Sequence, residues 1–216
     1  MDLLPLFPLP NVVLFPNVFL PLHIFEPRYR EMVADALKNH RMIGMVLLRP
    51  GWQGDYEGRP PVYPVGCSGV ITHAEQLNDG RYNIVLRGVE RFRILEEDDR
   101  LSYRRAHVEA LPDHTCSIED RNRIRTQRSK LDALLHPVLE RRIADIAAGA
   151  EGARIPAAMA DEDLVNALAQ YLDLDPLEKQ ALLEHRSLRS RAESLVELLE
   201  MKIMMAKTPG GSGVAH

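Results

Sequence analysis

Six prolines interrupt an apolar segment near the start of the chain, residues 5–32, which reads PLFPLPNVVLFPNVFLPLHIFEPRYREM. Because proline lacks a backbone N–H and its ring clashes with the preceding helical turn, this segment cannot form one long helix. The only early charge is Asp2, whereas a secretory signal needs a basic start and an unbroken apolar stretch. We therefore expect neither a signal peptide nor a membrane span, but short strands and turns that belong to the folded core.

Hydrophobic residues at every second position from 18 to 24 indicate a strand with one buried face. Pro21 cannot donate a hydrogen bond to a neighbouring strand, so this strand is expected at a sheet edge or at a bulge. The turn-forming pair Pro16 and Asn17 separates it from another short strand, expected at residues 12–15. Two strands and one turn would account for most of the opening segment.

One amphipathic helix is expected to follow, beginning at Pro27 and ending near residue 39. Proline suits the first position of a helix, and the apolar residues from Tyr29 to Leu37 recur at helical spacing. The unbroken apolar run at residues 42–48 indicates a buried strand. Residues 49–64 then form a long loop rich in glycine and proline.

The sequence Asn78-Asp79-Gly80 predicts the turn of a β-hairpin, because Asp-Gly readily adopts the left-handed backbone that such turns need. Gly88 breaks the alternation of the second hairpin strand, which predicts a bulge there. A last strand is expected within residues 101–111. Six strands and one helix in about 110 residues are typical of a small antiparallel sheet that is closed or nearly closed.

After residue 111 the sequence has a helical period for nearly all of its remaining length. Ser117 is expected to cap a helix that runs to about residue 148 and that Pro137 could kink. A second helix is expected at residues 161–172. Asp175 is expected to cap a third helix, and Ser190 a fourth that runs to about residue 207.

The charge balance argues against strong binding to nucleic acid. The chain has 27 lysines and arginines against 31 aspartates and glutamates, a formal net charge of -4. Non-specific binding to phosphate backbones requires a positive surplus. The two cysteines, Cys67 and Cys116, are far apart in the sequence, and without an export signal we expect reduced thiols in a cytoplasmic protein.

The motifs of several enzyme classes are missing from the sequence. It contains no GxxxxGK[ST] phosphate loop, no GxGxxG, no HExxH and no histidines at metal-ligand spacing. The segment Gly66-Cys67-Ser68-Gly69 differs from a nucleophile elbow, which needs one more residue before its second glycine and a helix after it. We therefore expect no catalytic residue, no metal and no cofactor.

Three segments together resemble the N-terminal, substrate-binding domain of the Lon protease family: LFPLPNVVLFP, HIFEPRYREM and DGRYNIVLRGVERFRI. The resemblance implies an α+β fold in which a six-stranded PUA-like pseudo-barrel with one inserted helix precedes a bundle of about four helices. We accordingly expect a β-rich pseudo-barrel at residues 1–111, a helical subdomain at 112–207 and a flexible tail at 208–216.

In Lon proteases such a domain recognises unfolded or hydrophobic polypeptide segments and delivers them to an ATPase ring. This sequence has neither the phosphate loop nor the Ser-Lys protease segment. The resemblance therefore implies a protein-binding module that acts as an adaptor in protein quality control, with a separate protease or chaperone ATPase as a partner. Candidate substrate contacts are Phe25, Glu26, Arg28, Tyr29, Trp52, Tyr63, Arg87, Arg91 and Phe92.

Several of these candidates have a structural alternative. Phe25 and Phe92 could belong to the core, and Glu26 could form a local ion pair with an arginine. Trp52 lies among glycines in a loop, so we expect it to be exposed. The oligomeric state is open.

Two other functions remain as alternatives. RNA binding is suggested by other PUA-like barrels and would show a steep loss of affinity with added salt. A hydrolase could use Glu26 or His23 as a base in a pocket under the Trp52 loop, although the sequence offers no nucleophile to complete such a site.

Overall fold

The computed structural model describes residues 3–56, 58–113, 117–146 and 159–207, with the backbone alone for residues 137–146 and 207. The chain forms two compact units. The barrel unit comprises Met1–His114 and Glu162–Arg186, and the helical unit comprises Thr115–Asp161 and Ser187–His216. Residues 162–186 therefore group with the strands, whereas the sequence pattern suggested one helical subdomain over residues 112–207. The predicted tail at residues 208–216 lies outside the described residues.

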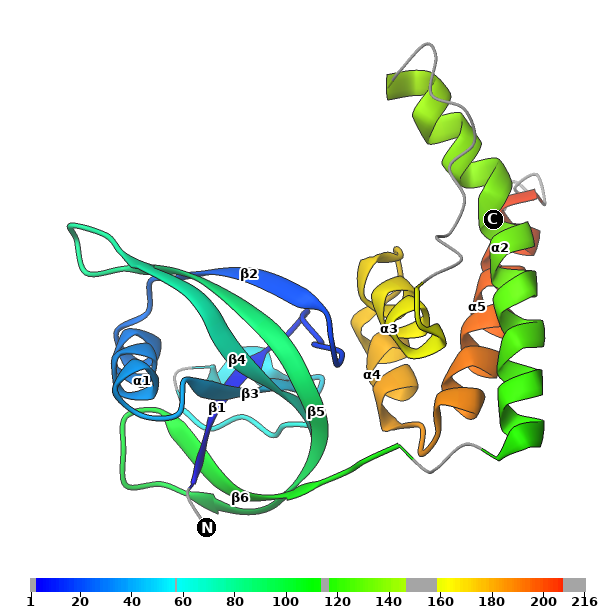
Figure 1. Ribbon diagram of the computed structural model, residues 1–216. Coiled ribbons are helices and arrows are strands. Elements are labelled where there is room, and N and C mark those ends of the chain that lie inside the picture. The colour runs from blue at the N-terminus through cyan, green and yellow to red at the C-terminus, as the bar shows by residue number, and fades with distance from the viewer. Residues whose placement is uncertain (1–2, 57, 114–116, 147–158, 208–216) are drawn as a thin grey trace, which may run out of the picture. The chain divides into compact units, whose positions relative to one another are not determined.

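Six strands form one mixed sheet in the order β2-β5-β4-β3-β1-β6, and β6 also pairs with β5. Because of this last pairing, β5, β4, β3, β1 and β6 close into a barrel, and β2 is added at the edge of β5 (Figure 1). The strands are β1 (Leu4–Leu9), β2 (Phe19–Ile24), β3 (Met42–Leu47), β4 (Val65–Gln76), β5 (Tyr82–Asp98) and β6 (Arg104–Ala110). The six strands expected for a pseudo-barrel are thus present in one sheet, and β2, which contains Pro21, is the expected edge strand.

The first strand differs from the prediction in place and in direction. β1 runs parallel to β3, with Leu6 opposite Gly44, so the sheet is not purely antiparallel as expected. The strand predicted at residues 12–15 is absent, although most of these residues are buried. The N–H of Phe15 instead donates to the side-chain oxygen of Gln170 over 3.2 Å. A side chain thus provides the hydrogen-bond partner that this buried backbone N–H would otherwise find in a neighbouring strand. The local pattern of apolar residues does not reveal such a distant partner.

The hairpin and its bulge are where the sequence predicted them. The turn between β4 and β5 contains Gly80, whose φ of 81° is in the left-handed region. Beyond it, Gly69 pairs with Gly88 while Ser68 pairs with Glu90, so one extra residue is inserted in β5 next to Gly88. Such an insertion bends the strand and increases its twist, which helps a sheet to close.

Gly88 also anchors the turn that precedes β2. Its N–H donates to the carbonyl oxygen of Val18 and its own carbonyl oxygen accepts from the N–H of Asn17, each over 2.9 Å. A Cβ atom at this position would overlap the carbonyl oxygen of Phe15. Only glycine therefore allows the turn to approach β5 so closely.

The core of the barrel unit lies on both faces of the curled sheet. Strands β1, β3, β5 and β6 contribute one residue each to a cluster of Leu6, Val46, Phe92 and Ala106. On the other side, helix α1 (Pro27–Lys38), at the predicted place, buries Tyr29, Met32, Val33 and Ala36. The ring of Tyr29 packs on that of Phe7, with 4.4 Å between their centroids.

Two later helices complete the barrel unit. Helix α3 (Asp161–Tyr171) and helix α4 (Pro176–Glu184) begin close to where the sequence predicted helices. The cap of α4 forms as expected, since the carboxylate of Glu178 accepts from the N–H of Asp175 over 2.7 Å. On the barrel side, the amide of Gln180 donates to the carbonyl oxygen of Val65 in β4 over 3.0 Å.

The helical unit is built around helix α2 (Ile118–Ile146) and helix α5 (Leu188–Lys207), which run side by side in the same direction (Figure 1). Ser117 caps α2 as predicted, because its hydroxyl accepts from the N–H of Asp120 over 3.0 Å. At α5 the predicted cap is wrong: Ser187, not Ser190, lies at the start and accepts from the N–H of Ser190 over 3.2 Å. None of the described helices is long and apolar enough to cross a membrane.

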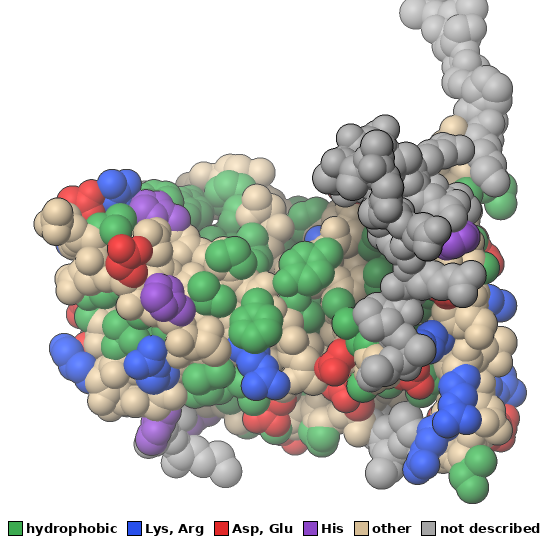
Figure 2. Space-filling view, turned by 45° about the horizontal axis from the view of Figure 1, so that its top comes forward, with side chains coloured by type: hydrophobic (Ala, Val, Ile, Leu, Met, Phe, Trp, Pro, Cys, Tyr) green, Lys and Arg blue, Asp and Glu red, His purple; other side chains and the backbone are tan. Residues whose placement is uncertain are grey.

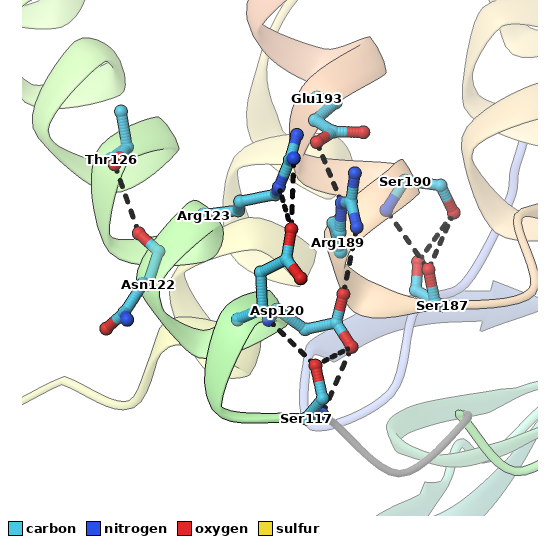
Figure 3. Close-up of polar contacts among 10 residues, drawn as sticks. Ser117, Asp120, Asn122, Arg123, Thr126, Ser187, Arg189, Ser190 and Glu193 are labelled. Carbon is cyan, nitrogen blue, oxygen red and sulfur yellow. Dashed lines mark hydrogen bonds and ion pairs between the residues drawn. The ribbon is translucent and has the colours of Figure 1, made fainter.

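Arg189 joins the first turns of these two helices (Figure 3). Its guanidinium lies 3.1 Å from the carboxylate of Asp120 on α2 and 3.0 Å from that of Glu193 on α5. Hydrogen bonds from Ser117 and the charge of Arg189 lower the pKa of Asp120. A carboxylate with a lowered pKa stabilises the folded state above its unfolded pKa, about 3.9, and this stabilisation is lost as the pH falls through the folded pKa.

We therefore expect Asp120→Asn to lower the midpoint of thermal unfolding of the helical unit at pH 7, and the difference from the wild type to vanish in acid below the folded pKa of Asp120. Circular dichroism at 222 nm, recorded against temperature at several pH values, measures this difference. A difference that stays constant from pH 7 to pH 2 would contradict the role assigned to the carboxylate charge.

Candidate functional site

An exposed row of side chains lies along the edge strand β2. Phe19, Pro21, His23 and Phe25 are all exposed and, two positions apart, point to the same face; we name them the edge surface. Phe19 is 51% exposed and Phe25 is 61% exposed, which is unusual for large apolar rings. At about 3.3 Å per residue the row is roughly 20 Å long. Figure 2 shows hydrophobic side chains gathered on a face of the barrel unit.

The edge surface continues across the neighbouring strands. The ring of Phe25 stacks near that of His23, with 6.3 Å between centroids. A hollow of about 350 Å³ joins Pro21 and His23 of β2 to Val85 of β5 and His73 of β4. These residues lie in register, since Pro21 pairs with Val85 and Val85 with His73. An extended chain or a helix could therefore rest on a broad, mostly apolar surface rather than on one side chain.

The outer backbone edge of β2 offers few hydrogen-bonding groups. Because the carbonyl oxygen of Val18 accepts from the N–H of Gly88 in β5, the alternation of a strand directs the polar backbone groups of Phe19, Pro21 and His23 outward. Pro21 has no N–H, and the carbonyl oxygen of Phe19 accepts from the hydroxyl of Tyr171 over 2.9 Å. The edge is thus protected against simple strand addition.

Three of the predicted contacts, Glu26, Arg28 and Trp52, form a cluster with Tyr56 at the start of α1. The Glu26 carboxylate lies 3.0 Å from the Arg28 guanidinium and accepts from the hydroxyl of Tyr56 over 2.5 Å. Burial of the hydroxyl is the main cause that raises the pKa of Tyr56, and this hydrogen bond is the second. Trp52 meets the edge of the Tyr56 ring at 5.4 Å and is half-buried, so the expectation of an exposed Trp52 is not met. The local ion pair expected for Glu26 is confirmed.

The other predicted contacts divide into exposed and buried residues. Arg87 is exposed and donates to the side-chain oxygen of Asn17 over 3.3 Å. Tyr63 is half-buried beneath the guanidinium of Arg49. Tyr29, Arg91 and Phe92 are buried, and Phe92 belongs to the core cluster. Of the two phenylalanines for which a core position was an alternative, only Phe92 occupies one.

Arg91 is a buried connection inside the barrel unit. Its guanidinium lies 2.7 Å from the carboxylate of Asp113, after β6, and is only 3% exposed. It also donates to the carbonyl oxygen of Leu183 over 3.0 Å and to that of His185, at the end of α4. These contacts explain why α4 belongs to the same compact unit as β5.

A comparison with known families and proteins gives these surfaces a context. The profile of a family described as ATP-dependent protease La (LON) substrate-binding domain matches residues 3–201. The chain belongs to this family. Lon protease 2 of Myxococcus xanthus is 29% identical over 201 residues, which are 93% of this chain and 24% of that protein. Lon protease of Anaeromyxobacter dehalogenans is 29% identical over 199 residues, 92% of this chain and 23% of that protein. The chain thus spans about a quarter of the length of these relatives.

Solved structures of Lon domains share the fold. The N-terminal domain of a Lon protease from the Mycobacterium avium complex superposes with a TM-score of 0.68 at 17% identity, over 92% of this chain and 98% of that one. The Lon N-terminal domain protein of Xanthomonas campestris gives a TM-score of 0.57 at 24% identity, over 97% of this chain and 100% of that one. The α+β architecture is therefore that of Lon N-terminal domains.

The substrate contacts expected from the sequence did not include Phe19 and Pro21 of the edge surface or Tyr171 beside them, and His23 was named only as a possible base. A signal for Phe19 was present, because it falls on the face of the strand opposite to the buried residues. Tyr171 is 152 positions away from Phe19 and carries no such signal. Among the described residues, no group of three His, Cys, Asp or Glu side chains could hold a metal ion.

Proposed function

We propose that this Lon substrate-binding domain captures unfolded or hydrophobic polypeptide segments on the edge surface, as a binding adaptor in protein quality control. The observation that carries the proposal is the pair of exposed phenylalanines, Phe19 and Phe25, on one face of an edge strand. Exposed apolar patches on folded domains mark interaction sites. Arg87, which is also exposed, adds a donor for the polar groups of a bound chain.

Side-chain burial, rather than strand addition, would supply the affinity. Complete burial of a phenylalanine side chain contributes about 1.5–3 kcal/mol, and here roughly half of each ring remains to be buried. A dissociation constant of tens of micromolar corresponds to roughly -6 kcal/mol. The two rings would supply about 1.5–3 kcal/mol of this, and the adjoining hollow and the rest of the edge surface would have to supply the remainder. Because Pro21 offers no donor and Tyr171 occupies the carbonyl oxygen of Phe19, backbone pairing adds little. Weak capture with rapid release suits a module that passes its substrate to a separate ATPase.

We assign no bond-breaking step to the described residues. The Glu26 carboxylate, one candidate base, is engaged by both Arg28 and Tyr56. His23, the other, contacts the side chains of Asn83 and Arg81 rather than a hydroxyl or thiol nucleophile. RNA binding is disfavoured by the formal net charge of -4 and by the apolar character of the edge surface.

Phe19→Ser combined with Phe25→Ser is expected to weaken the binding of an unfolded polypeptide about tenfold or more, because both exposed rings are lost. Fluorescence anisotropy with a labelled, permanently unfolded polypeptide measures the dissociation constant. The matched control is Leu95→Ser, since Leu95 is 61% exposed on β5 but outside the edge surface. The control should bind within twofold of the wild type.

The salt dependence of the same titration distinguishes polypeptide from RNA binding. Capture by apolar rings should change little between 50 and 500 mM salt, whereas phosphate contacts would lose affinity steeply. The proposal fails if the wild type shows no saturable binding at tens of micromolar, or if the double variant and the Leu95→Ser control bind equally well.

A further inference from the structure

A second pocket of the barrel unit has a different chemistry from the edge surface. It has a volume of about 200 Å³ and lies between the first turn of α1, the long loop after β3 and the segment that leads into β6. Its lining includes three arginines, Arg28, Arg59 and Arg104, with Tyr29 and Tyr56 beside them. None of the described residues that line it is an aspartate or glutamate.

Arg104 forms the floor of this arginine pocket. It is only 9% exposed, and one of its terminal nitrogens donates to the carbonyl oxygen of Pro60 over 2.8 Å. Its Nε atom lies 3.1 Å from the carboxylate of Glu97 but has no hydrogen-bond partner among the described residues. Burial lowers the pKa of Arg104; the carboxylate of Glu97 opposes this decrease, and the nearby charges of Arg59 and Arg28 add to it. An anion bound next to such a buried guanidinium would stabilise its charged form.

The other two arginines differ in whether a carboxylate balances their charge. Arg28 is paired with Glu26 at 3.0 Å. Arg59 is exposed and donates only to carbonyl oxygens, those of Asp98 and Leu101, each over 3.3 Å. No carboxylate of the described residues forms an ion pair with it. The described residues of the pocket therefore carry a surplus of positive charge, to which the N-terminal end of the α1 dipole adds.

We propose that the arginine pocket binds a small oxyanion, a phosphate or a carboxylate group, between the guanidinium groups of Arg59 and Arg104. Planar guanidinium groups match both anions through paired N–H donors. The volume admits one such group with a short substituent but not a folded chain. None of the edge-surface residues lines the pocket. The oxyanion would therefore bind at a site separate from the one proposed for the polypeptide.

Isothermal titration calorimetry of the whole chain with inorganic phosphate and, separately, with acetate tests the proposal, at constant ionic strength maintained with chloride. We expect a dissociation constant at or below the millimolar range for at least one anion, and the tighter of the two identifies the ligand class. At ten times the dissociation constant, the same anion should raise the melting temperature by about 3–6 °C.

Arg59→Gln is the decisive variant, because Arg59 is exposed and its loss should leave the fold intact. We expect at least a fivefold weaker affinity in this variant. Arg93→Gln, which removes the same charge from an exposed position outside the pocket, should keep the wild-type affinity. A shift of the Arg104 Nε–H resonance on titration would report contact directly. No saturation by either anion up to 20 mM, or equal affinities of the two variants, would overturn the proposal.

Discussion

Replacing Gly88 with alanine is expected to destabilise the barrel unit by about 2–4 kcal/mol, a large effect for one methyl group. The new Cβ atom would overlap the carbonyl oxygen of Phe15 and lie 2.8 Å from its carbonyl carbon. These are backbone atoms, which cannot rotate away as a flexible side chain can. Relief of the clash would move the turn before β2 and break the hydrogen bonds of Gly88 with Asn17 and Val18.

Urea denaturation followed by the fluorescence of Trp52 measures this loss as a lower midpoint at an unchanged slope. Gly54→Ala provides the control, since a Cβ atom at Gly54 meets no atom within 4 Å. We expect the control to change the free energy of unfolding by less than about 0.5 kcal/mol. A Gly88→Ala variant as stable as the control would contradict the close contact between Gly88 of β5 and the turn before β2.

Arg91→Met is expected to cost about 3–5 kcal/mol, because removal of one partner from a buried ion pair leaves the other partner uncompensated. The carboxylate of Asp113 would lose its charged neighbour, and the carbonyl oxygens of Leu183 and His185 would lose their donor. The methionine side chain fills much of the same volume, so the loss would come from the polar contacts and not from a cavity.

Chemical denaturation of Arg91→Met beside Arg93→Met separates the buried arginine from an exposed neighbour on the same strand. The exposed variant should remain within about 0.5 kcal/mol of the wild type. Polypeptide binding by the folded fraction of the Arg91→Met variant should be unchanged. A variant with wild-type stability and lost binding would instead return Arg91 to the substrate contacts that the sequence suggested.

Local sequence signals predicted much of the barrel. Pro27 and an apolar stripe fix helix α1, Asp79-Gly80 fixes the hairpin turn, and Pro21 marks the edge strand. Each of these features depends on residues that are neighbours in the sequence, so it can be predicted from one sequence without knowledge of the fold. The bulge at Gly88 belongs to the same group, because a glycine that interrupts an alternating strand is visible without knowledge of its partner.

Pairings between distant segments could not be predicted in this way. The parallel alignment of β1 with β3 depends on which strands meet, not on the composition of either. Arg91 was assigned to the binding surface because nothing near it in the sequence reveals Asp113 and the end of α4 as its partners. The arginine pocket likewise joins residues 28, 59 and 104, which follow no common spacing.

The membership of α3 and α4 in the barrel unit affects how the chain must be synthesised and dissected. The last strand ends at Ala110, yet the carbonyl groups that accept hydrogen bonds from Arg91 belong to Leu183 and His185. At about 5–20 residues per second, a ribosome that has completed this strand needs roughly 4–15 seconds more to supply them. During that interval Arg91 of the nascent barrel lacks the two carbonyl oxygens that accept its hydrogen bonds in the complete chain. A fragment cut after the last strand would lack them permanently.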